Sequence, residues 1–393
     1  MNPPGVKGYR SEKIIFKDAP SRAKRIVSSG DTIVSTVRTY LKAITRIEDA
    51  TNVIVSTGFT VLTPKKNVLS SFCSNWVISE TLINRINAIS KGVSYPATNA
   101  TEIGDLYIVL PPLSEQKEIA SYLDTTTGQL DQKIDLLDKK AVQYEKLKQS
   151  LIDEIVTCGL DKSAPIRNCN VHLIKEIPEH WKICRLKEVG YLYSGLTGKS
   201  GDDFINENEY SEPYVPFTNI ANNFYLSTSE LKSVCISPSE KQNFVKKYDL
   251  FFLMSSEDYA DLGKCSLLRS DMEKKTYLNS FCKGFRFTKH SINPSYINYL
   301  LHSTPYRITL SNEGNGFTRI NLRMEKINDI QILVPPQLEQ QAISKYLDEK
   351  TMQIDAILKS ISAEIEKLKS LRKALINDVV TGKIKVTSEG LAV

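Results

Sequence analysis

A fourteen-residue motif occurs twice in this chain. "PPLSEQKEIASYLD" occupies residues 111–124, and "PPQLEQQAISKYLD" follows 224 positions later at residues 335–348. Pro-Pro, Glu-Gln, Ile and Tyr-Leu-Asp recur at the same spacing, which is improbable by chance in 393 residues. The repetition indicates a duplicated structural unit.

A long helical pattern follows each copy of the motif, and its apolar positions alternate in steps of four and three. Pro-Pro ends the preceding strand and starts each helix, because proline fits a first helical turn but not a helix interior. A stripe of this length is typical of a coiled coil, in which a lone charge fixes register. The first seam comprises Leu130, Ile134, Leu137, Ala141, Tyr144, Lys148, Leu151 and Ile155, and the second comprises Ile354, Leu358, Ile361, Ile365, Leu368, Arg372, Leu375 and Val379.

The two seams coincide under the 224-residue offset, including their single charged positions, Lys148 and Arg372. We expect the helices to pack on each other as an antiparallel coiled coil. The alternative is two separate amphipathic helices, each lying on its own globular domain.

Outside the two helical stretches, the sequence has β-rich runs interrupted by Gly and Ser. This pattern predicts two globular domains, or globules, each of the α+β class. The order is therefore globule, helix, globule, helix. The predicted boundaries are 1–110 for the first globule, 111–158 for its helix, 159–176 for a linker, 177–334 for the second globule, 335–382 for its helix and 383–393 for a tail.

Composition favours a protein of the cytoplasm. Hydrophobic residues make up 41% and charged residues 24%, which is ordinary for a globular chain. No apolar run approaches the ~18 to 20 residues of a membrane span, and the N-terminus lacks a signal-peptide core. The seven dispersed cysteines indicate free thiols in a reducing compartment, and the four histidines lack metal-ligand spacing.

Positive charge gathers in the first globule. Residues 1–110 hold 14 Lys and Arg against 8 Asp and Glu, and residues 10–46 hold nine basic residues against three acids. A face of this kind binds polyanions, because each neutralised phosphate releases condensed counterions. A solvated basic face without a ligand remains the alternative.

These motifs together resemble the specificity subunit of type I restriction-modification systems. The two Pro-Pro motifs, each leading a heptad helix that ends "LIDEIVTCGL" or "LINDVVTGKI", are similar to the repeated helical regions of that family. "EIPEHWKICRLKEV" at 176–189 resembles the opening of a target recognition domain, and "APSRAKRIVSSGDTIVSTVRTYLKAI" with "STGFTVLTP" resembles an internal stretch of one. The resemblance covers essentially the whole chain.

The resemblance implies a non-catalytic, DNA-binding subunit. Each globule would read one half of a bipartite duplex target, and the helices would separate the globules and seat two methyltransferase subunits. S-adenosylmethionine, ATP and magnesium would then bind to partners, including restriction subunits that translocate and cleave DNA in host defence. We expect no cofactor, metal or membrane contact in this chain.

Basic and polar residues in turn-rich stretches are the candidates for contacting DNA. Arg pairs bidentately with guanine, while Lys or Tyr holds phosphates. The candidates are Ser21, Arg22, Lys24, Arg25, Arg38, Tyr40 and Lys42 in the first globule, and Thr197, Lys199, Lys264, Asn315, Thr318 and Arg319 in the second.

Three short motifs raise the alternative of an intrinsic enzyme. "NPPG" at 2–5 and "NPSY" at 293–296 each partly match the Asn-Pro-Pro-aromatic loop of adenine methyltransferases, and "GLTGKS" at 195–200 lacks the glycine spacing of a phosphate loop. A scaffold whose globules bind protein is the other alternative. DNA binding with a steep salt dependence would distinguish a DNA reader from such a scaffold.

The first globule is expected to be shorter than the second at its N-terminal side. Gly30 and Asp31 correspond to Tyr248 and Asp249, and the distances from these aspartates to the following Pro-Pro are similar, at 80 and 86 residues. Upstream, 30 residues separate Met1 from Asp31, against 72 between Ile177 and Asp249. We expect the shorter globule to be the less stable one, because a domain of ~110 residues has little core to lose.

If the helices set the spacing of the two half-sites, inserting four residues after Tyr144 will lengthen that helix by ~6 Å. We expect the gap between the methylated half-sites to change while the half-sites themselves stay the same. Methylome sequencing of cells that carry the variant measures both. An unchanged gap with retained activity would exclude this spacer role.

Overall fold

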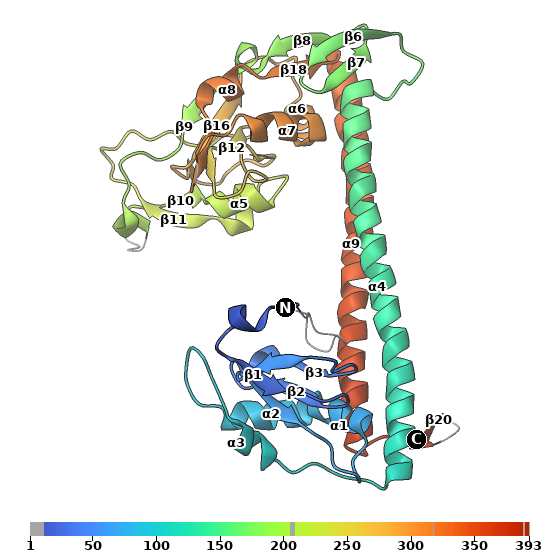
Figure 1. Cartoon of the computed structure of the whole chain (residues 1–393). Helices are drawn as coiled ribbons and strands as arrows, with labels where there is room; N and C mark the ends of the chain where they lie inside the picture. Colours follow the sequence, from blue (N-terminus) through green and yellow to red (C-terminus); the bar gives the residue numbers. More distant parts are fainter. Residues whose placement is uncertain (1–11, 205–208, 317, 388–389, 393) are drawn as a thin grey trace. The chain divides into compact units, whose positions relative to one another are not determined.

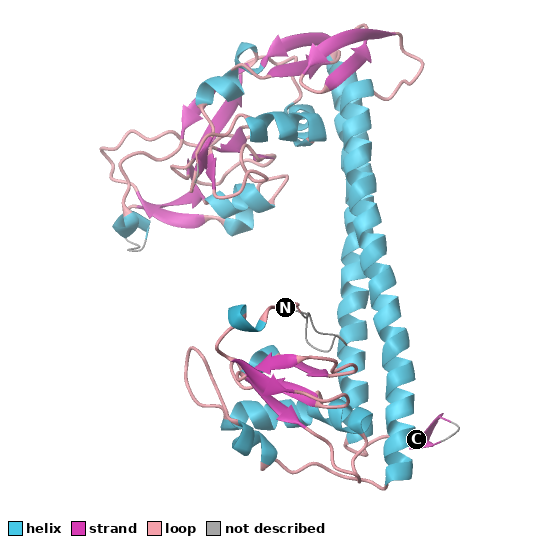
Figure 2. Cartoon of the chain, viewed as in Figure 1, coloured by secondary structure: helices cyan, strands magenta, loops and turns pink. Residues whose placement is uncertain are grey.

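The computed structural model describes residues 12–204, 209–316, 318–387 and 390–392. The chain forms two compact units, one built from residues up to 141 together with those from 359 onward, the other from residues 142–358. Each unit holds one mixed globule of helices and strands (Figures 1 and 2). The long helices α4 (Leu113–Cys158) and α9 (Gln337–Val380) contribute to both units. The expected α+β class is confirmed.

Besides its parts of α4 and α9, the first unit contains short strands and helices. They are η1 (Phe16–Asp18), β1 (Ala23–Ile26), β2 (Thr32–Ser35), η2 (Thr39–Leu41), β3 (Ile44–Arg46), β4 (Ile54–Ser56), β5 (Phe59–Leu62), α1 (Ser70–Val77), α2 (Glu80–Ile89), α3 (Ala100–Gly104), β19 (Lys385–Thr387) and β20 (Gly390–Ala392).

The second unit has more strands. They and its helices are β6 (Ile166–Val171), β7 (Ile174–Pro178), β8 (Lys182–Arg185), η3 (Leu186–Glu188), β9 (Gly190–Ser194), η4 (Gly201–Phe204), β10 (Ser211–Val215), α5 (Phe217–Asn222), η5 (Thr228–Glu230), β11 (Lys232–Cys235), β12 (Leu250–Leu253), β13 (Ser255–Ser256), β14 (Cys265–Leu267), β15 (Tyr277–Leu278), β16 (Cys282–Phe287), α6 (Pro294–His302), α7 (Thr304–Asn312), β17 (Ile320–Asn321), α8 (Met324–Asn328) and β18 (Gln331–Val334).

The central sheets of the two globules correspond strand by strand. The first has the order β3-β2-β5 and the second β14-β12-β16-β9, so β2 matches β12. Gly30 and Tyr248 both have positive φ values, 92° and 69°, at the turn before the central strand. The next residues, Asp31 and Asp249, accept a backbone N–H from three positions upstream at 2.7 and 2.8 Å. The correspondence inferred from the sequence therefore has a structural counterpart, whereas no described strand beside β5 matches β9.

Each globule packs on the beginning of one long helix and the end of the other. In the first core, Phe72 and Trp76 of α1 pack with Leu123 of α4 and Ile376 of α9. The second core joins its sheet and α6 to α4 and α9 through residues including Val156 and Leu347. Burial of large apolar side chains thus fixes each globule on the helices of its own unit.

The duplicated motif places one buried glutamine at the same position in both units. Gln116 Nε2 donates to the carbonyls of Pro111 and Asn67 at 2.8 and 3.0 Å, and its Oε1 accepts the Leu69 N–H at 2.7 Å. Leu69 is the N-cap residue of α1, so the glutamine joins the start of α4 to the start of α1.

Gln340 makes the same three contacts 224 residues later. Its Nε2 donates to Pro335 and Ser291 at 2.8 and 3.2 Å, and its Oε1 accepts the N–H of Asn293, the N-cap of α6, at 2.8 Å. Both glutamines are 1% exposed. Each buried amide thereby pairs both its oxygen and its nitrogen with backbone groups, as a buried polar side chain requires.

A second repeated contact ties each globule to the end of the other helix. Asn377 of α9 accepts hydrogen bonds from the backbone N–H and hydroxyl of Thr81 at 3.0 and 2.8 Å. Asp153, which is 224 positions earlier on α4, accepts the Thr304 N–H at 2.8 Å. These side chains accept hydrogen bonds from backbone N–H groups in the first turns of α2 and α7, which have no partner within their own helix.

The predicted seam positions are buried or half-buried along both helices. Each charged seam residue forms an ion pair with an aspartate on the facing helix, Lys148 with Asp355 at 2.7 Å and Arg372 with Asp131 at 2.8 Å. Asp131 and Asp355 are themselves 224 residues apart, so the two ion pairs are reciprocal. Within the first unit, Lys133 also meets Glu364 at 2.9 Å, and the opposite order of partners shows that α4 and α9 run antiparallel there.

The predicted linker, residues 159–176, is an ordered part of the second unit. It contains β6 and most of β7, which pair as an antiparallel hairpin, and Val171 and Ile174 join the core. The Gly, Pro and Asn residues of this segment are typical of loops, so its sequence does not indicate strands. The tail likewise contains the paired strands β19 and β20, and Val386 is buried in the first core.

We expect Lys148→Leu and Arg372→Leu to keep the melting temperature within a few degrees of wild type. Their aspartate partners are 55% and 41% exposed and stay hydrated without the cation, and replacing a seam charge by an apolar residue is often neutral or stabilising. Asp131→Asn should cost more, because it leaves the buried guanidinium without its carboxylate. Calorimetry compares the three variants. A large drop for either leucine variant would contradict the seam assignment.

The stability of the second unit should fall as the pH decreases from 7 to 5. Burial lowers the pKa of His302 to about 4, while its Nε2 bonds the Cys265 carbonyl at 2.8 Å. The unfolded state, with an ordinary histidine pKa of about 6.5, binds the proton more tightly, so acid removes about 2 kcal/mol of unfolding free energy by pH 5.

Urea unfolding of a Trp76→Phe background, in which Trp181 reports on the second unit alone, measures this loss. His302→Gln should flatten the pH dependence. An equal pH dependence in both proteins would show that His302 is not its source.

Candidate nucleic-acid interface

In each globule, two loops pair at the end of the central strand. In the second globule, β13 and β17 pair antiparallel, and the Leu322 N–H donates to Met254 at 2.8 Å. In the first, Val37 bridges to Ala97 and the Arg38 N–H donates to Pro96 at 2.7 Å. We call residues 36–43 with 91–98, and residues 254–264 with 313–323, the paired loops.

An arginine stacks on an exposed aromatic ring at the paired loops of both globules. The Arg38 guanidinium lies 4.4 Å from the centroid of Tyr95, and that of Arg319 lies 4.5 Å from Phe281. The rings are 62% and 48% exposed. Stacking holds a guanidinium flat while its N–H groups stay available at the edges, which is the geometry that pairs bidentately with a base.

The backbone of the first paired loops is strained at two non-glycine residues. Arg38 and Lys42 flank η2 with φ values of 52° and 53°. Such conformations cost about 1–3 kcal/mol each and persist where surrounding contacts enforce them. Thr39, which lies between them, is buried, and its hydroxyl donates to Asn87 Oδ1 of α2 at 2.7 Å. That anchor leaves Tyr40 and Val37 exposed beside Arg38.

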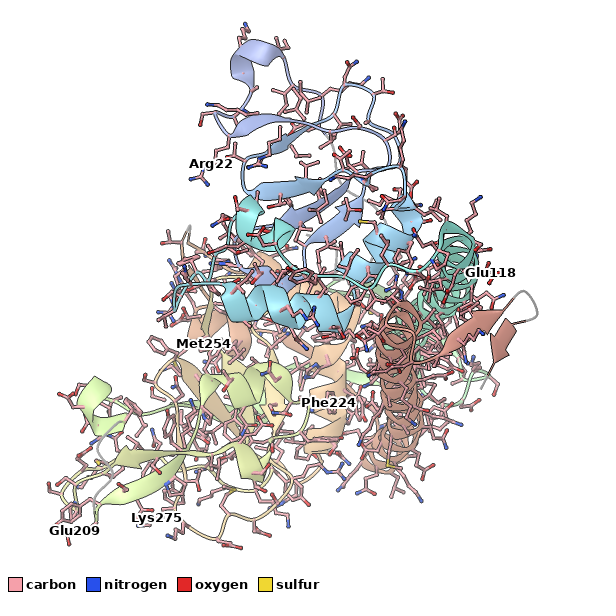
Figure 3. All side chains as sticks on the ribbon, turned by 90° about the horizontal axis from the view of Figure 1, so that it is seen from below. Arg22, Glu118, Glu209, Phe224, Met254 and Lys275 are labelled. Atoms are coloured by element: carbon pink, nitrogen blue, oxygen red, sulfur yellow. The ribbon has the colours of Figure 1, made fainter. Side chains whose placement is uncertain are left out.

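Other predicted residues of the first globule lie nearby. The Arg22 carbonyl accepts the Thr57 N–H, the neighbouring Gly58 carbonyl accepts the N–H of Thr36, and Thr36 in turn bonds Thr98. Arg22 therefore lies at the same end of the globule as the paired loops, and its side chain projects away from the ribbon (Figure 3). Ser21 is its exposed neighbour, Lys24 and Arg25 lie further along β1, and Lys42 pairs with Glu80 of α2.

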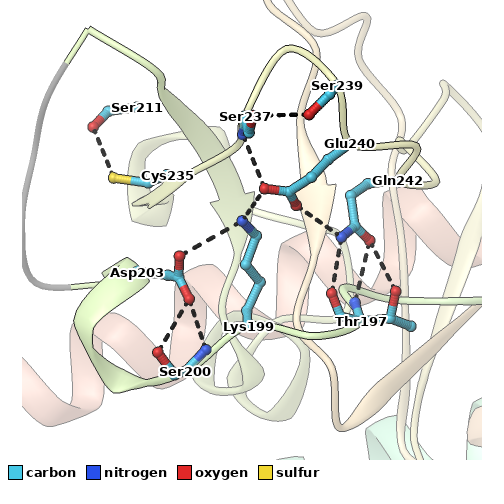
Figure 4. A network of polar contacts seen from close by, with 10 residues as sticks. All are labelled: Thr197, Lys199, Ser200, Asp203, Ser211, Cys235, Ser237, Ser239, Glu240 and Gln242. Atoms are coloured by element: carbon cyan, nitrogen blue, oxygen red, sulfur yellow. Dashed lines mark hydrogen bonds and ion pairs between the residues drawn. The ribbon is translucent and has the colours of Figure 1, made fainter.

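The predicted residues of the second globule fall into two groups. Lys264, Asn315, Thr318 and Arg319 all belong to the paired loops. Lys264 pairs with Asp261 at 2.6 Å, and the Asn315 backbone exchanges hydrogen bonds with Asn321. Thr197 and Lys199 instead join a separate polar network after β9 (Figure 4).

Lys199 is directed inward within that network. Its side chain is 5% exposed, and Nζ lies 2.7 Å from Glu240 and 3.6 Å from Asp203. Burial lowers the pKa of Lys199, but the two carboxylates outweigh burial and leave the pKa raised. Thr197 is bonded through its N–H to Gln242 at 3.2 Å. Both residues therefore lie outside the paired loops, within this separate network.

The enzyme-like motifs have structural explanations or lie outside the described residues. "NPPG" at 2–5 is outside them. In "NPSY", Asn293 caps α6 by accepting the N–H groups of Ser295 and Tyr296, and Tyr296 is fully buried in the core. Over the described residues, no three His, Cys, Asp or Glu side chains gather where they could hold a metal ion. Of the helices the structure describes, none is both long and apolar enough to cross a membrane.

The aromatic partners Tyr95 and Phe281 were not among the sequence candidates. Tyr95 stands in the turn-rich stretch "GVSYP", which is a usable signal. Phe281 directly precedes the buried strand β16 and reads as a core residue. Only the fold brings it beneath Arg319.

Comparison with known proteins gives one consistent family. The family model described as "Type I restriction modification DNA specificity domain" matches residues 5–141 and 178–367. The type I restriction enzyme MjaVIII specificity subunit of Methanocaldococcus jannaschii is 26% identical over 304 residues, which cover 76% of this chain and 66% of that relative. This chain thus spans slightly less than two thirds of that relative's length.

Two solved structures share the fold. A chain from the study "Structural basis underlying complex assembly and conformational transition of the type I R-M system" matches with a TM-score of 0.73 and 22% identity, covering 94% of this chain and 86% of that one. The HsdS subunit from Thermoanaerobacter tengcongensis matches with a TM-score of 0.51 and 22% identity, covering 94% and 85%.

Proposed function

Because this chain belongs to the type I restriction-modification DNA specificity family, we propose that it is the sequence-recognition subunit of a type I restriction-modification complex. Each globule reads one half of a bipartite duplex target through its paired loops. The observation that carries this assignment is that an arginine stacks on an exposed aromatic ring at the paired loops of both globules.

The chemistry of the paired loops suits the reading of base edges. A guanidinium pairs bidentately with O6 and N7 of guanine in the major groove. Exposed Val37, Tyr40 and Val93 beside Arg38 offer apolar contacts to a thymine methyl group or a base face. Arg22 and Lys24 supply charge for phosphates, which set position rather than sequence.

The two globules would differ in what they read because their loops differ. Arg38 lies in the loop that follows β2, whereas Arg319 lies in the loop that precedes α8. The stacked arginine therefore comes from opposite members of the paired loops, and its ring comes from the paired loops in the first globule (Tyr95) but from the residue before β16 in the second (Phe281). A non-palindromic target follows from that difference.

Methyl transfer and DNA cleavage belong to other subunits in this proposal. Two methyltransferase subunits, which bind S-adenosylmethionine, dock on this chain, and restriction subunits with ATP and magnesium complete the complex in the cytoplasm. Support comes from the repeat itself: the glutamine contacts, helix-end contacts and seam ion pairs all occur twice, which suits a partner present in two copies.

Replacing each stacked arginine tests the assignment of one globule to one half-site. We expect Arg38→Ala to relax or abolish recognition in one half of the methylated sequence, and Arg319→Ala to do so in the other half. Loss of a bidentate contact costs about 1–3 kcal/mol, or roughly 5- to 150-fold in preference for the correct base.

Methylome sequencing of cells that also carry the partner subunits measures the change. Arg185→Ala is the matched control, since Arg185 is exposed and pairs with Asp329 away from the paired loops. If both loop variants kept the wild-type sequence preference, or weakened every position equally, the paired loops would not be the reading surface.

A further inference from the structure

A basic cleft of about 750 Å³ opens in the second unit, at the start of β12. Its walls are the turn of residues 246–249, the segment of residues 286–295 that leads from β16 into α6, and the first turns of α9, residues 337–349. The α9 wall is part of the duplicated motif. None of these residues belongs to the paired loops.

Three lysines at the cleft carry uncompensated charge. Lys246, Lys289 and Lys345 are exposed, and none forms an ion pair with another residue that the structure describes. The acids nearby are already engaged: Asp249 pairs with Arg286 at 2.6 Å and Asp348 with Arg269 at 2.9 Å. Glu349 is the remaining acid in the lining, so the cleft has a surplus of positive charge that favours an anionic occupant.

The floor of the cleft is preorganised. Asp249 is 1% exposed and accepts hydrogen bonds from Tyr193 at 2.7 Å and from the Lys246 N–H at 2.8 Å, besides its pairing with Arg286. Tyr193 lies across Gly284, where a Cβ atom would stand 2.1 Å from the ring. The turn that carries Lys246 is therefore fixed before anything binds.

The cleft and the paired loops lie at opposite ends of the central strand. Asp249 precedes β12 and Met254 follows it, and four strand residues span about 13 Å. A duplex read by the paired loops would rest at the far end of this strand. The position of the cleft therefore favours a protein occupant over the DNA that the loops read.

Basic residues also occur at the corresponding place on the first globule, although the individual positions differ: Lys345 corresponds to Ser121, and Lys246, by the alignment of Asp249 with Asp31, corresponds to Ser28. Lys65 and Lys66 correspond to Lys289 and His290, in the segments that Gln116 and Gln340 hold. Lys117, which corresponds to Gln341, adds an exposed cation from α4. Basic residues at this place on both globules, away from the paired loops, fit a protein partner bound in two copies.

We propose that the cleft receives an acidic segment of the methyltransferase subunit, and that the lysines at the corresponding place on the first globule receive the same segment of a second copy. The inference rests on the proposed function for the identity of the partner. Lys246, Lys289 and Lys345 bind carboxylates of the partner's acidic segment. The affinity should therefore fall as the salt concentration rises.

Charge reversal in the full-length chain tests the proposal. The variant Lys246→Glu, Lys289→Glu, Lys345→Glu is compared with Lys175→Glu, Lys232→Glu, Lys241→Glu, which changes three exposed lysines of the same unit and the net charge by the same amount. Biolayer interferometry measures the affinity for the purified methyltransferase subunit without DNA, at two salt concentrations. Fluorescence anisotropy measures the affinity for a nonspecific duplex. Where the triple variant melts lower than the control, Lys289→Glu alone replaces it.

We expect the cleft variant to bind the methyltransferase subunit at least 10-fold more weakly than the control variant, with equal affinity for the duplex. Equal partner affinity in both variants would overturn the proposal. So would a selective loss of duplex affinity, which would identify the cleft as a DNA site. Absence of methyltransferase binding by the wild-type chain would instead contradict the proposed function.

Discussion

Two buried glutamines fix what the rest of this structure can do. Gln116 and Gln340 each join the first turn of a long helix to the N-terminus of a helix in the globule. The amide oxygen accepts one hydrogen bond and the amide nitrogen donates two. An amide provides two donors and an acceptor in a fixed plane, so it sets orientation as well as attachment. An apolar residue at either position would remove the hydrogen bonds to one backbone N–H and two backbone carbonyls. This requirement explains why the glutamine of the motif occurs in both copies.

The helices deliver a second constraint, which acts along their length. A cation in an apolar seam tolerates few partners, and Asp131 and Asp355 supply them from the facing helix. Asp131 corresponds to Asp355 in the repeat, and Lys148 corresponds to Arg372. Each copy of the repeat therefore supplies the aspartate of one ion pair and the cation of the other. These ion pairs also specify the antiparallel arrangement of the helices, because that arrangement brings Asp131 to Arg372 within the first unit.

The periodic and repeated parts of the structure were predictable from sequence, and the loops were not. Heptad spacing gave the seam, and the similar distances to the following Pro-Pro gave the correspondence of Gly30 with Tyr248, whose positive φ values agree. The hairpin of β6 and β7 was not predicted from the predicted linker. These strands are short, and their Asn and Pro residues interrupt the alternation of apolar and polar residues that indicates a strand. Lys199 looked like a surface donor because sequence reports charge but not the carboxylates of Glu240 and Asp203 that surround it. Phe281 was missed for the converse reason, since an aromatic beside a buried strand is ordinarily core.

The separation of the attachment contacts from the paired loops has a combinatorial consequence. The contacts that hold each globule use Gln116 and Asn377 in one unit and Gln340 and Asp153 in the other, and none of these residues is in a paired loop. A change in one pair of loops therefore leaves its own attachment and the other globule untouched. Repertoires then multiply: every variant of one globule can be combined with every variant of the other on the same frame. A lineage that shuffled halves would generate new addresses on DNA faster than one that altered loops residue by residue.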